Sequence, residues 1–313
     1  MATRSTTEHH SYHGAFVTAS LPVDATVEVG DTAFDTTTGL MQVCTAVGPV
    51  VWTPQSAGGG GANYYAPTFI VGNTAQGDVA GTNCDFVDAA GIVSALAALP
   101  VTGGWVHIKR GTYTLTSFLE ITLSNTTVTG DGAATIIVPD ATALPAFEMP
   151  AENSRLQNLA IRLSATVPAS AAHIINVEGS CIVSDIIIDA TNLIVGVGTL
   201  SRLVTVTSLS GVVMIRGCFL GNVTVGTVDG IDASGVDNAA EMQIKDNVID
   251  TITGAGIRSG GTGNQITGNQ LLAITGTDIV DTGTSNLILG NTLLGGAIDI
   301  TGATTPEVLG NVT

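Results

Sequence analysis

Carboxylate side chains are the groups in this sequence most able to do chemistry, and they recur through its second half. Two carboxylates about 5 to 9 Å apart can hydrolyse a glycosidic bond, one acting as the acid and the other as the base or nucleophile. If the chain is an enzyme, the candidates are Asp232, Asp250, Asp281 and Asp299. They belong to a larger set of acids that we expect to point outward: Asp185, Asp189, Asp229, Asp232, Asp237, Glu241, Asp250, Asp278, Asp281 and Asp299.

A short phrase recurs in the stretch that carries these acids. Each copy has an apolar residue, one spacer, a Gly, Asp or Asn, and a second short apolar-alternating run. The Gly, Asp or Asn serves as a register mark, at Asn158, Asp185, Gly217, Asp246, Gly268, Gly290 and Gly310. The steps between marks are 27, 32, 29, 22, 22 and 20 residues. Periods of this length indicate a solenoid, in which each repeat buries its apolar face against the next.

The repeats are strand-like, because apolar residues alternate over short runs rich in β-branched side chains. A leucine-rich repeat would need a fixed Leu scaffold and a helix, and the sequence has neither. The pattern therefore predicts an all-β chain that forms a right-handed, single-stranded parallel β-helix. The alternative is an ordinary β-sandwich with unrelated Asn-Gly turns.

The residue after the register mark is asparagine in the last four copies: Asn247, Asn269, Asn291 and Asn311. We expect these side chains to stack as a structural ladder along one edge of the coil, each amide bonding the copies above and below. Asparagine tolerates a left-handed backbone, so we also expect it to occupy the left-handed position of the turn.

A second column follows each mark, as Ile231-Asp232, Ile257-Arg258, Ile279-Val280 and Ile298-Asp299. The isoleucines should point inward and their neighbours outward, since side chains alternate along a strand. Adjacent coils lie about 4.8 Å apart. This register predicts a surface ion pair between Asp232 and Arg258 and leaves Asp299 isolated.

A lyase-type site would need several acids converging on a base. The basic residues of the repeat region are Arg155, Arg162, Arg202, Arg216, Lys245 and Arg258, and none lies in a recognisable acid cluster. After residue 151 there is no Trp or Tyr and one Phe, Phe219. Sugar-cleaving grooves usually offer aromatic faces, which give large contact area at low entropic cost. We therefore predict no catalytic residue, no cofactor and no metal site.

The net charge limits the partners of the chain. Nine Lys and Arg stand against 26 Asp and Glu, giving a formal charge of −17. The negative electrostatic potential that this charge produces repels nucleic acid and anionic membranes, so we expect neither as a partner. The N-terminal sequence lacks the apolar segment of a signal peptide, and no run reaches transmembrane length. Of the four cysteines, Cys181 and Cys218 lie in apolar runs and are expected to be buried thiols.

The N-terminal part divides at a glycine series. Residues 1–57 read as a polar arm and a small β-module, with short strands that include 25–29, 40–46 and 50–53, and residues 58–63 form a Gly-rich linker. His9, His10 and His13 could ring a metal ion on a three-fold axis. A flexible arm is the preferred interpretation, because nothing supplies a second shell of partners for the histidines.

Residues 64–150 should form the entry to the β-helix, and residues 151–313 its repeats. Within the entry, residues 85–99 predict an amphipathic helix with Phe86, Ile92, Ala95, Leu96 and Leu99 on one face. Pro100 would stop it.

Four phrases of the entry carry a resemblance: Ala-Leu-Ala-Ala-Leu-Pro (95–100), Gly-Gly-Trp-Val-His-Ile (103–108), Arg-Gly-Thr-Tyr-Thr-Leu (110–115) and Val-Thr-Gly-Asp-Gly-Ala (128–133). Together they resemble the opening of pectin-lyase-like β-helix proteins, most of all those of bacteriophage tailspikes and other virion spikes. The resemblance covers roughly residues 66–313. It implies that the helix caps the N-terminal end of the solenoid and hides its first unpaired coil.

The resemblance also implies a function. The chain would be a homotrimeric structural appendage of a bacteriophage virion (a tail spike or tail fibre, a head fibre or a capsid decoration protein), assembled in the cytoplasm of the host bacterium. Residues 1–57 would anchor it to a capsid, portal, adaptor or tail protein, and the β-helix would face outward for host attachment, with a host surface glycan as a further partner. The alternative is a tailspike depolymerase, a glycoside hydrolase or lyase acting on host capsule or lipopolysaccharide.

Overall fold

The computed structural model describes residues 12–16, 32–35, 40–47, 50–54, 68–140, 143–163, 173–191, 200–207, 211–224, 226–235 and 240–312. The chain divides into two compact units, Met1–Tyr64 and Tyr65–Thr313. The first unit contains a four-stranded sheet in the order β1 (Tyr12–Phe16), β2 (Thr32–Asp35), β3 (Leu40–Val47) and β4 (Val50–Pro54). β1 and β2 are parallel, and the other neighbours are antiparallel. The expected strand at 25–29 and the linker at 58–63 lie outside the described residues.

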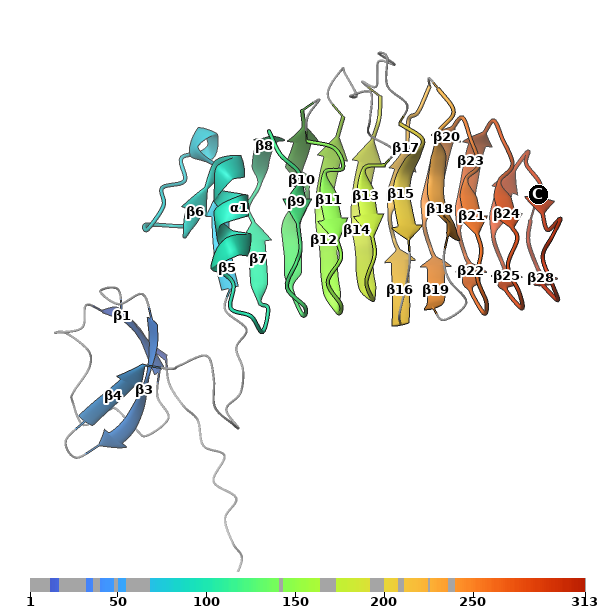
Figure 1. The fold of residues 1–313 in the computed structure, drawn as a ribbon. Coiled ribbons are helices and arrows are strands. Elements are labelled where there is room, and N and C mark those ends of the chain that lie inside the picture. Colours follow the sequence, from blue (N-terminus) through green and yellow to red (C-terminus); the bar gives the residue numbers. More distant parts are fainter. Residues whose placement is uncertain are drawn as a thin grey trace, which may run out of the picture. The chain divides into compact units, whose positions relative to one another are not determined.

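The second unit is a right-handed parallel β-helix, which confirms the predicted fold class (Figure 1). Each coil contributes to three faces, and strands on one face pair in parallel with those of the coils before and after. The first face contains β5 (Thr68–Gly72), β7 (Trp105–Ile108), β10 (Thr127–Pro139), β12 (Ser154–Arg162), β14 (Cys181–Asp189), β16 (Gly211–Arg216), β19 (Ala240–Lys245), β22 (Gln265–Thr267), β25 (Leu287–Leu289) and β28 (Glu307–Leu309), with β6 (Phe86–Val87) beside β5.

β10, β12 and β14 bend and continue onto the second face, so the two faces form one 16-stranded sheet. The other strands of the second face are β8 (Gly111–Leu115), β17 (Phe219–Gly221), β20 (Val248–Ile252), β23 (Gln270–Ile274) and β26 (Thr292–Leu294). The third face is a separate eight-stranded sheet of β9 (Leu119–Glu120), β11 (Phe147–Met149), β13 (Ile175–Val177), β15 (Arg202–Thr207), β18 (Asp229–Gly235), β21 (Ile257–Ser259), β24 (Ile279–Asp281) and β27 (Ile298–Asp299).

The core consists of columns of stacked apolar side chains on all three faces. On the third face the column is Leu119, Phe147, Ile175, Val204, Ile231, Ile257, Ile279 and Ile298. All of these except the last are buried, and Ile298 is partly buried. Because a parallel strand pairs on both edges and alternates its side chains, every coil must supply an apolar residue at the same register position. That requirement is the physical origin of the repeated phrase.

The bend between the first and second faces sits at the register marks. All seven of them have a positive φ, from 56° at Asn158, Asp185 and Asp246 to 67° at Gly268. Among the described residues, the ladder asparagines are not in that left-handed region. The expectation that asparagine supplies the left-handed turn position was therefore wrong by one residue. Gly, Asp and Asn occupy the position before it, where their short or absent side chains lower the strain.

Helix α1 (Asp88–Ala98) covers the N-terminal end of the solenoid over its first two faces. It begins later than expected because Phe86 and Val87 form β6, which pairs with β5. Ile92 and Ala95 are fully buried. The helix packs against β5, β6, β7 and β8. Those strands belong to the first two faces, so β9, the edge strand of the third face, is left beside the helix rather than beneath it.

Candidate functional site

The third face carries the outward column in which the sequence placed candidate acids. The register of the last four coils is as predicted, with Asp232 beside Arg258, Arg258 beside Val280 and Val280 beside Asp299. The column continues backwards through residues that sequence reasoning did not align: Glu120, Glu148, Asn176 and Thr205. Asn176, Thr205 and Asp232, in the middle of the column, are nearly buried although they occupy outward positions.

Two arginine–aspartate pairs form within this face, and they differ from the predicted pair. Arg258 donates from Nε to Oδ2 of Asp229 at 2.6 Å, and Arg202 pairs with Asp232. The predicted surface ion pair between Asp232 and Arg258 was therefore wrong. Register makes those two residues neighbours, but the long arginine side chain reaches along the strand to Asp229, which precedes the aligned position.

Further donors hold both of these carboxylates. Asp229 Oδ1 accepts from the backbone N of Ala255 at 2.6 Å. Asp232 Oδ1 accepts from the backbone N and Oγ of Ser234, at 2.9 Å and 2.6 Å. The hydrogen bond to Asp229 raises the pKa of Arg258. Each carboxylate thus joins a guanidinium of a neighbouring coil to a backbone N–H, and both of its oxygens are occupied.

The four candidate acids do not converge. Three coil spacings separate Asp232 from Asp299, or about 14 Å, which exceeds the span of a hydrolytic carboxylate pair. Asp250 lies in β20 on the second face. Asp299 is exposed, and hydrogen bonds from Thr301 lower its pKa. Asp281 is fully buried and accepts from Asn286 Nδ2 at 2.7 Å.

The expectation that Asp278 and Asp281 point outward was wrong, because both are fully buried. Asp281 follows Ile279 by two residues, so strand alternation itself directs it inward. Asp278 lies in the turn just before β24, where alternation does not apply. Its two carboxylate oxygens have no hydrogen-bond partner among the described residues, and burial raises its pKa. Asp237 lies outside the described residues.

The asparagine ladder is a continuous hydrogen-bonded column at the corner between the first and second faces. Oδ1 of Asn269 accepts from both the backbone N and Nδ2 of Asn247, at 3.1 Å and 2.9 Å, and its own Nδ2 donates to the Ile244 carbonyl at 3.0 Å. Asn291 and Asn311 repeat this pattern in the following coils. Asn247, Asn269 and Asn291 are fully buried.

Sequence reasoning missed a second, shorter ladder of asparagines. Oδ1 of Asn286 accepts from the backbone N of Asn264 at 2.8 Å, and Oδ1 of Asn264 accepts from that of Met242 at 3.0 Å. The sequence signal was the pattern Gly-Thr-x-Asn, which precedes the marks Gly268 and Gly290 by four residues. Both ladders satisfy buried backbone donors at bends, so they are structural sites.

The described residues bear on three further expectations, which concern metal binding, membrane crossing and the cysteines. Within the described ranges, no group of three or more His, Cys, Asp or Glu could hold a metal ion. His9, His10 and the side chain of His13 lie outside the description. Across the same ranges, no helix combines the length and apolar character that a membrane crossing requires. Cys181 and Cys218 are confirmed as buried free thiols, and burial raises their pKa values to about 11 and about 12.

Comparisons with known proteins find similar folds. No family model matches the chain, and no curated protein matches it. A similar solved structure is ORF18 of Geobacillus virus E2, with a TM-score of 0.35, 13% identity, and coverage of 96% of this chain and 73% of that one. Two others are the pectin methylesterases of Erwinia chrysanthemi (TM-score 0.43, 12% identity, 74% and 80% coverage) and Aspergillus niger (0.43, 10%, 81% and 91%). Similarities at this level carry no argument about what this chain binds or does.

Proposed function

We propose that the chain is a structural appendage of a bacteriophage particle, attached through residues 1–57 and displaying its β-helix outward for host adsorption. The observation that carries the proposal is the fate of the candidate acids. Asp232 is locked to Arg202 and Ser234, Asp281 is buried, and Asp250 and Asp299 stand apart on different faces or coils. Charged side chains whose bonds hold neighbouring coils together are consistent with a rigid structural spike. The resemblance of residues 95–133 to the opening of virion spikes supports the same function.

The appendage would be a homotrimer, and an exposed apolar surface near its last coils supports that part of the proposal. Leu289 and Leu309 are register neighbours at outward positions of the first face, and Leu294 is exposed at the end of the second. Between Arg258 and Asp299 the only charged residues are Asp278 and Asp281, and both are buried. The exposed Glu307 lies two residues before Leu309 on the outward side of β28, so the patch has one acid at its margin. Copies of a chain with a net charge of −17 repel one another, so an apolar patch that carries little charge is the surface best suited to contact between copies.

A specific observation favours depolymerisation as the second candidate. Glu120 and Glu148 are neighbours in the outward column, in coils whose backbones lie about 4.8 Å apart. Burial, followed by the charges of Glu178 and Glu120, raises the pKa of Glu148. A carboxyl group with a raised pKa beside a second carboxylate is what a glycoside hydrolase uses as its general acid.

Incubation of the purified chain with host capsule or lipopolysaccharide, followed by an assay for released oligosaccharide, separates the two functions. We expect no sustained release from the intact chain. Sustained release that is lost in Glu148→Gln but kept in Asp232→Asn would overturn the structural proposal and establish the depolymerase. Binding of the same glycan without cleavage would agree with a role in adsorption.

A further inference from the structure

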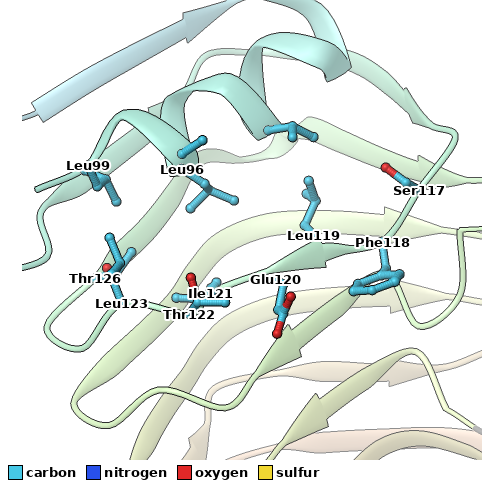
Figure 2. Close-up of a pocket in the computed structure, with 12 residues that line it drawn as sticks. Leu96, Leu99, Ser117, Phe118, Leu119, Glu120, Ile121, Thr122, Leu123 and Thr126 are labelled. Carbon is cyan, nitrogen blue, oxygen red and sulfur yellow. The ribbon is translucent and has the colours of Figure 1, made fainter. Parts of the chain in front are cut away.

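An apolar groove of about 350 Å³ lies between α1 and the segment around β9. Figure 2 shows its two walls, with Leu96 on the helix and Leu99 just after its end facing Leu119 and Leu123 on the strand segment. Val93 on the helix and Phe118 beside the strand also line it, and both are large apolar residues that remain exposed. The groove exists because α1 packs over the strands of the first two faces and leaves the first strand of the third face uncovered.

The strand wall of the groove has an unpaired edge. Among the described residues, β9 pairs only with β11. The backbone N–H groups of Leu119 and Ile121 point towards that neighbour, where they donate to Ala146 and Glu148 at 3.0 Å and 2.9 Å. Because backbone groups alternate between the two edges of a strand, those of Glu120 and Thr122 face the groove. An open edge of this kind is a template for an added strand.

The outer rim of the groove is acidic. Glu120 lines the groove, Glu148 lies beside it in the next coil, and the charge of Glu178 acts on Glu148 as well. Glu178 accepts a hydrogen bond from Asn176 at 2.8 Å. Within the described part of the chain, none of these three glutamates takes part in an ion pair. The mutual repulsion of these carboxylates would be relieved by a cation from outside.

We propose that this groove binds an extended segment of a partner protein by strand addition, and that the segment alternates apolar and basic residues. Its backbone continues the third-face sheet at the free edge of β9. Its apolar side chains enter between Leu96 and Leu119, and its Lys or Arg side chains lie over Glu120 and Glu148. A second copy of this chain is a poor source of such a segment, since it has 9 basic residues against 26 acidic ones. The site is independent of the proposed structural function. It competes with the depolymerase alternative, because both use Glu120 and Glu148.

The test uses the intact chain and a fluorescein-labelled peptide of alternating Lys and Val, roughly seven residues long, with binding followed by fluorescence anisotropy. We expect saturable binding, and slower hydrogen exchange in residues 118–122 of the bound chain. A Glu-Val peptide should not bind, because its charges meet the acidic rim. A Lys-Gly peptide has the same charge without the apolar side chains, and it should bind at least roughly tenfold more weakly.

Substitutions locate the site. Ala97→Trp fills the groove from an exposed position of the helix, and Glu120→Lys reverses the charge of the rim. Each should weaken binding of the Lys-Val peptide by roughly tenfold or more. Ala98→Trp, exposed but outside the groove, and Glu241→Lys, an exposed acid of the first face, are the matched controls and should bind as the intact chain does. Thermal melts monitor the folding of each variant. Equal binding of the Lys-Gly peptide, or binding unaffected by Ala97→Trp, would reduce the interaction to non-specific attraction by an acidic protein and overturn the proposal.

Discussion

Arg258 holds Asp229 of the preceding coil at 2.6 Å, and the same aspartate accepts the backbone N–H of Ala255 at 2.6 Å. Asp229 therefore ties two coils together through one carboxylate that is almost entirely buried. A side chain in this position stabilises the stack and offers little to a substrate. The pair illustrates how charged residues are used across the third face of this solenoid.

Removal of the arginine should destabilise the fold. Arg258→Ala leaves the Asp229 carboxylate with its backbone donor alone, in a site with little access to water. We expect the free energy of unfolding to fall by about 1–3 kcal/mol, the cost of an unsatisfied buried polar group. Urea denaturation measures the change. Arg216→Ala removes an exposed arginine from the first face and is the control, with an expected effect within about 0.5 kcal/mol. Equal losses from both variants would contradict the structural role of the Asp229 pair.

The asparagine ladder predicts a dependence on position. Asn269→Leu removes the acceptor of the Asn247 backbone N–H and of one Nδ2 hydrogen of Asn247, and the side-chain donor to the Ile244 carbonyl. Nδ2 of Asn247 keeps its bond to the Ile215 carbonyl. These losses lie in a buried corner and cost about 1–3 kcal/mol for each unsatisfied group. Asn311→Leu removes the same kinds of bond, but Asn311 is only partly buried and water can replace them. The melting temperature should fall more for Asn269→Leu. Equal and negligible changes would show that the ladder does not hold the coils.

Asp278 predicts a pH dependence of stability. Burial raises the pKa of its carboxyl group above the ordinary value of 3.8. Between the two values the folded chain holds a proton that the unfolded chain has released, so the contribution of this group to the free energy of unfolding falls as the pH rises. Asp278→Ala introduces the residue found at the aligned position of the next coil, Ala297.

The Asp278→Ala variant should melt at a higher temperature than the intact chain at neutral pH. The difference should shrink as the pH falls through the folded pKa towards 3.8. Differential scanning calorimetry over that range measures it. A constant difference at all pH values would mean that the carboxylate is compensated in the folded chain. Asp299→Ala, which removes an exposed acid, is the comparison.

The leucine surface predicts the oligomeric state. Leu289→Lys combined with Leu309→Lys places two charges on the patch proposed to join copies, where charge would have to be desolvated. We expect a trimer for the intact chain and a monomer for the double variant in analytical ultracentrifugation. Val101→Lys alters a more exposed apolar residue beyond α1 and should leave the trimer intact. A double variant that remains trimeric would move the contact elsewhere.

The sequence was most informative where every coil must repeat one physical solution. The bend requires a left-handed residue, and each of the seven marks, from Asn158 to Gly310, has a positive φ. The inward isoleucines of the last four coils follow from the same regularity. Sequence reasoning failed where contacts depend on side-chain reach or on long coils. Arg258 forms its ion pair with Asp229 and not with its aligned neighbour, Asp232. Glu120 and Glu148 lie in early coils of unequal length, so their alignment could not be inferred from a regular repeat.

Burial of polar groups was also hard to predict. Asp281 is in phase with Ile279 and could have been placed inward by alternation, whereas the burial of Asp278 depends on a turn that no periodicity describes. The open edge of β9 depends on where an 11-residue helix comes to rest against the first coil. Such tertiary placement has no counterpart in a local pattern.

The measurement that tests the proposed function most directly is incorporation into the particle. The intact chain and a variant that lacks residues 1–57 would be produced during infection, each with an epitope tag, and particles would be purified on a density gradient. The second compact unit begins at Tyr65, so the shortened chain retains the whole β-helix, and circular dichroism would check its fold. We predict that the intact chain co-purifies with the particles and the shortened chain does not. Absence of the intact chain from purified particles, or equal incorporation of both chains, would contradict the proposal.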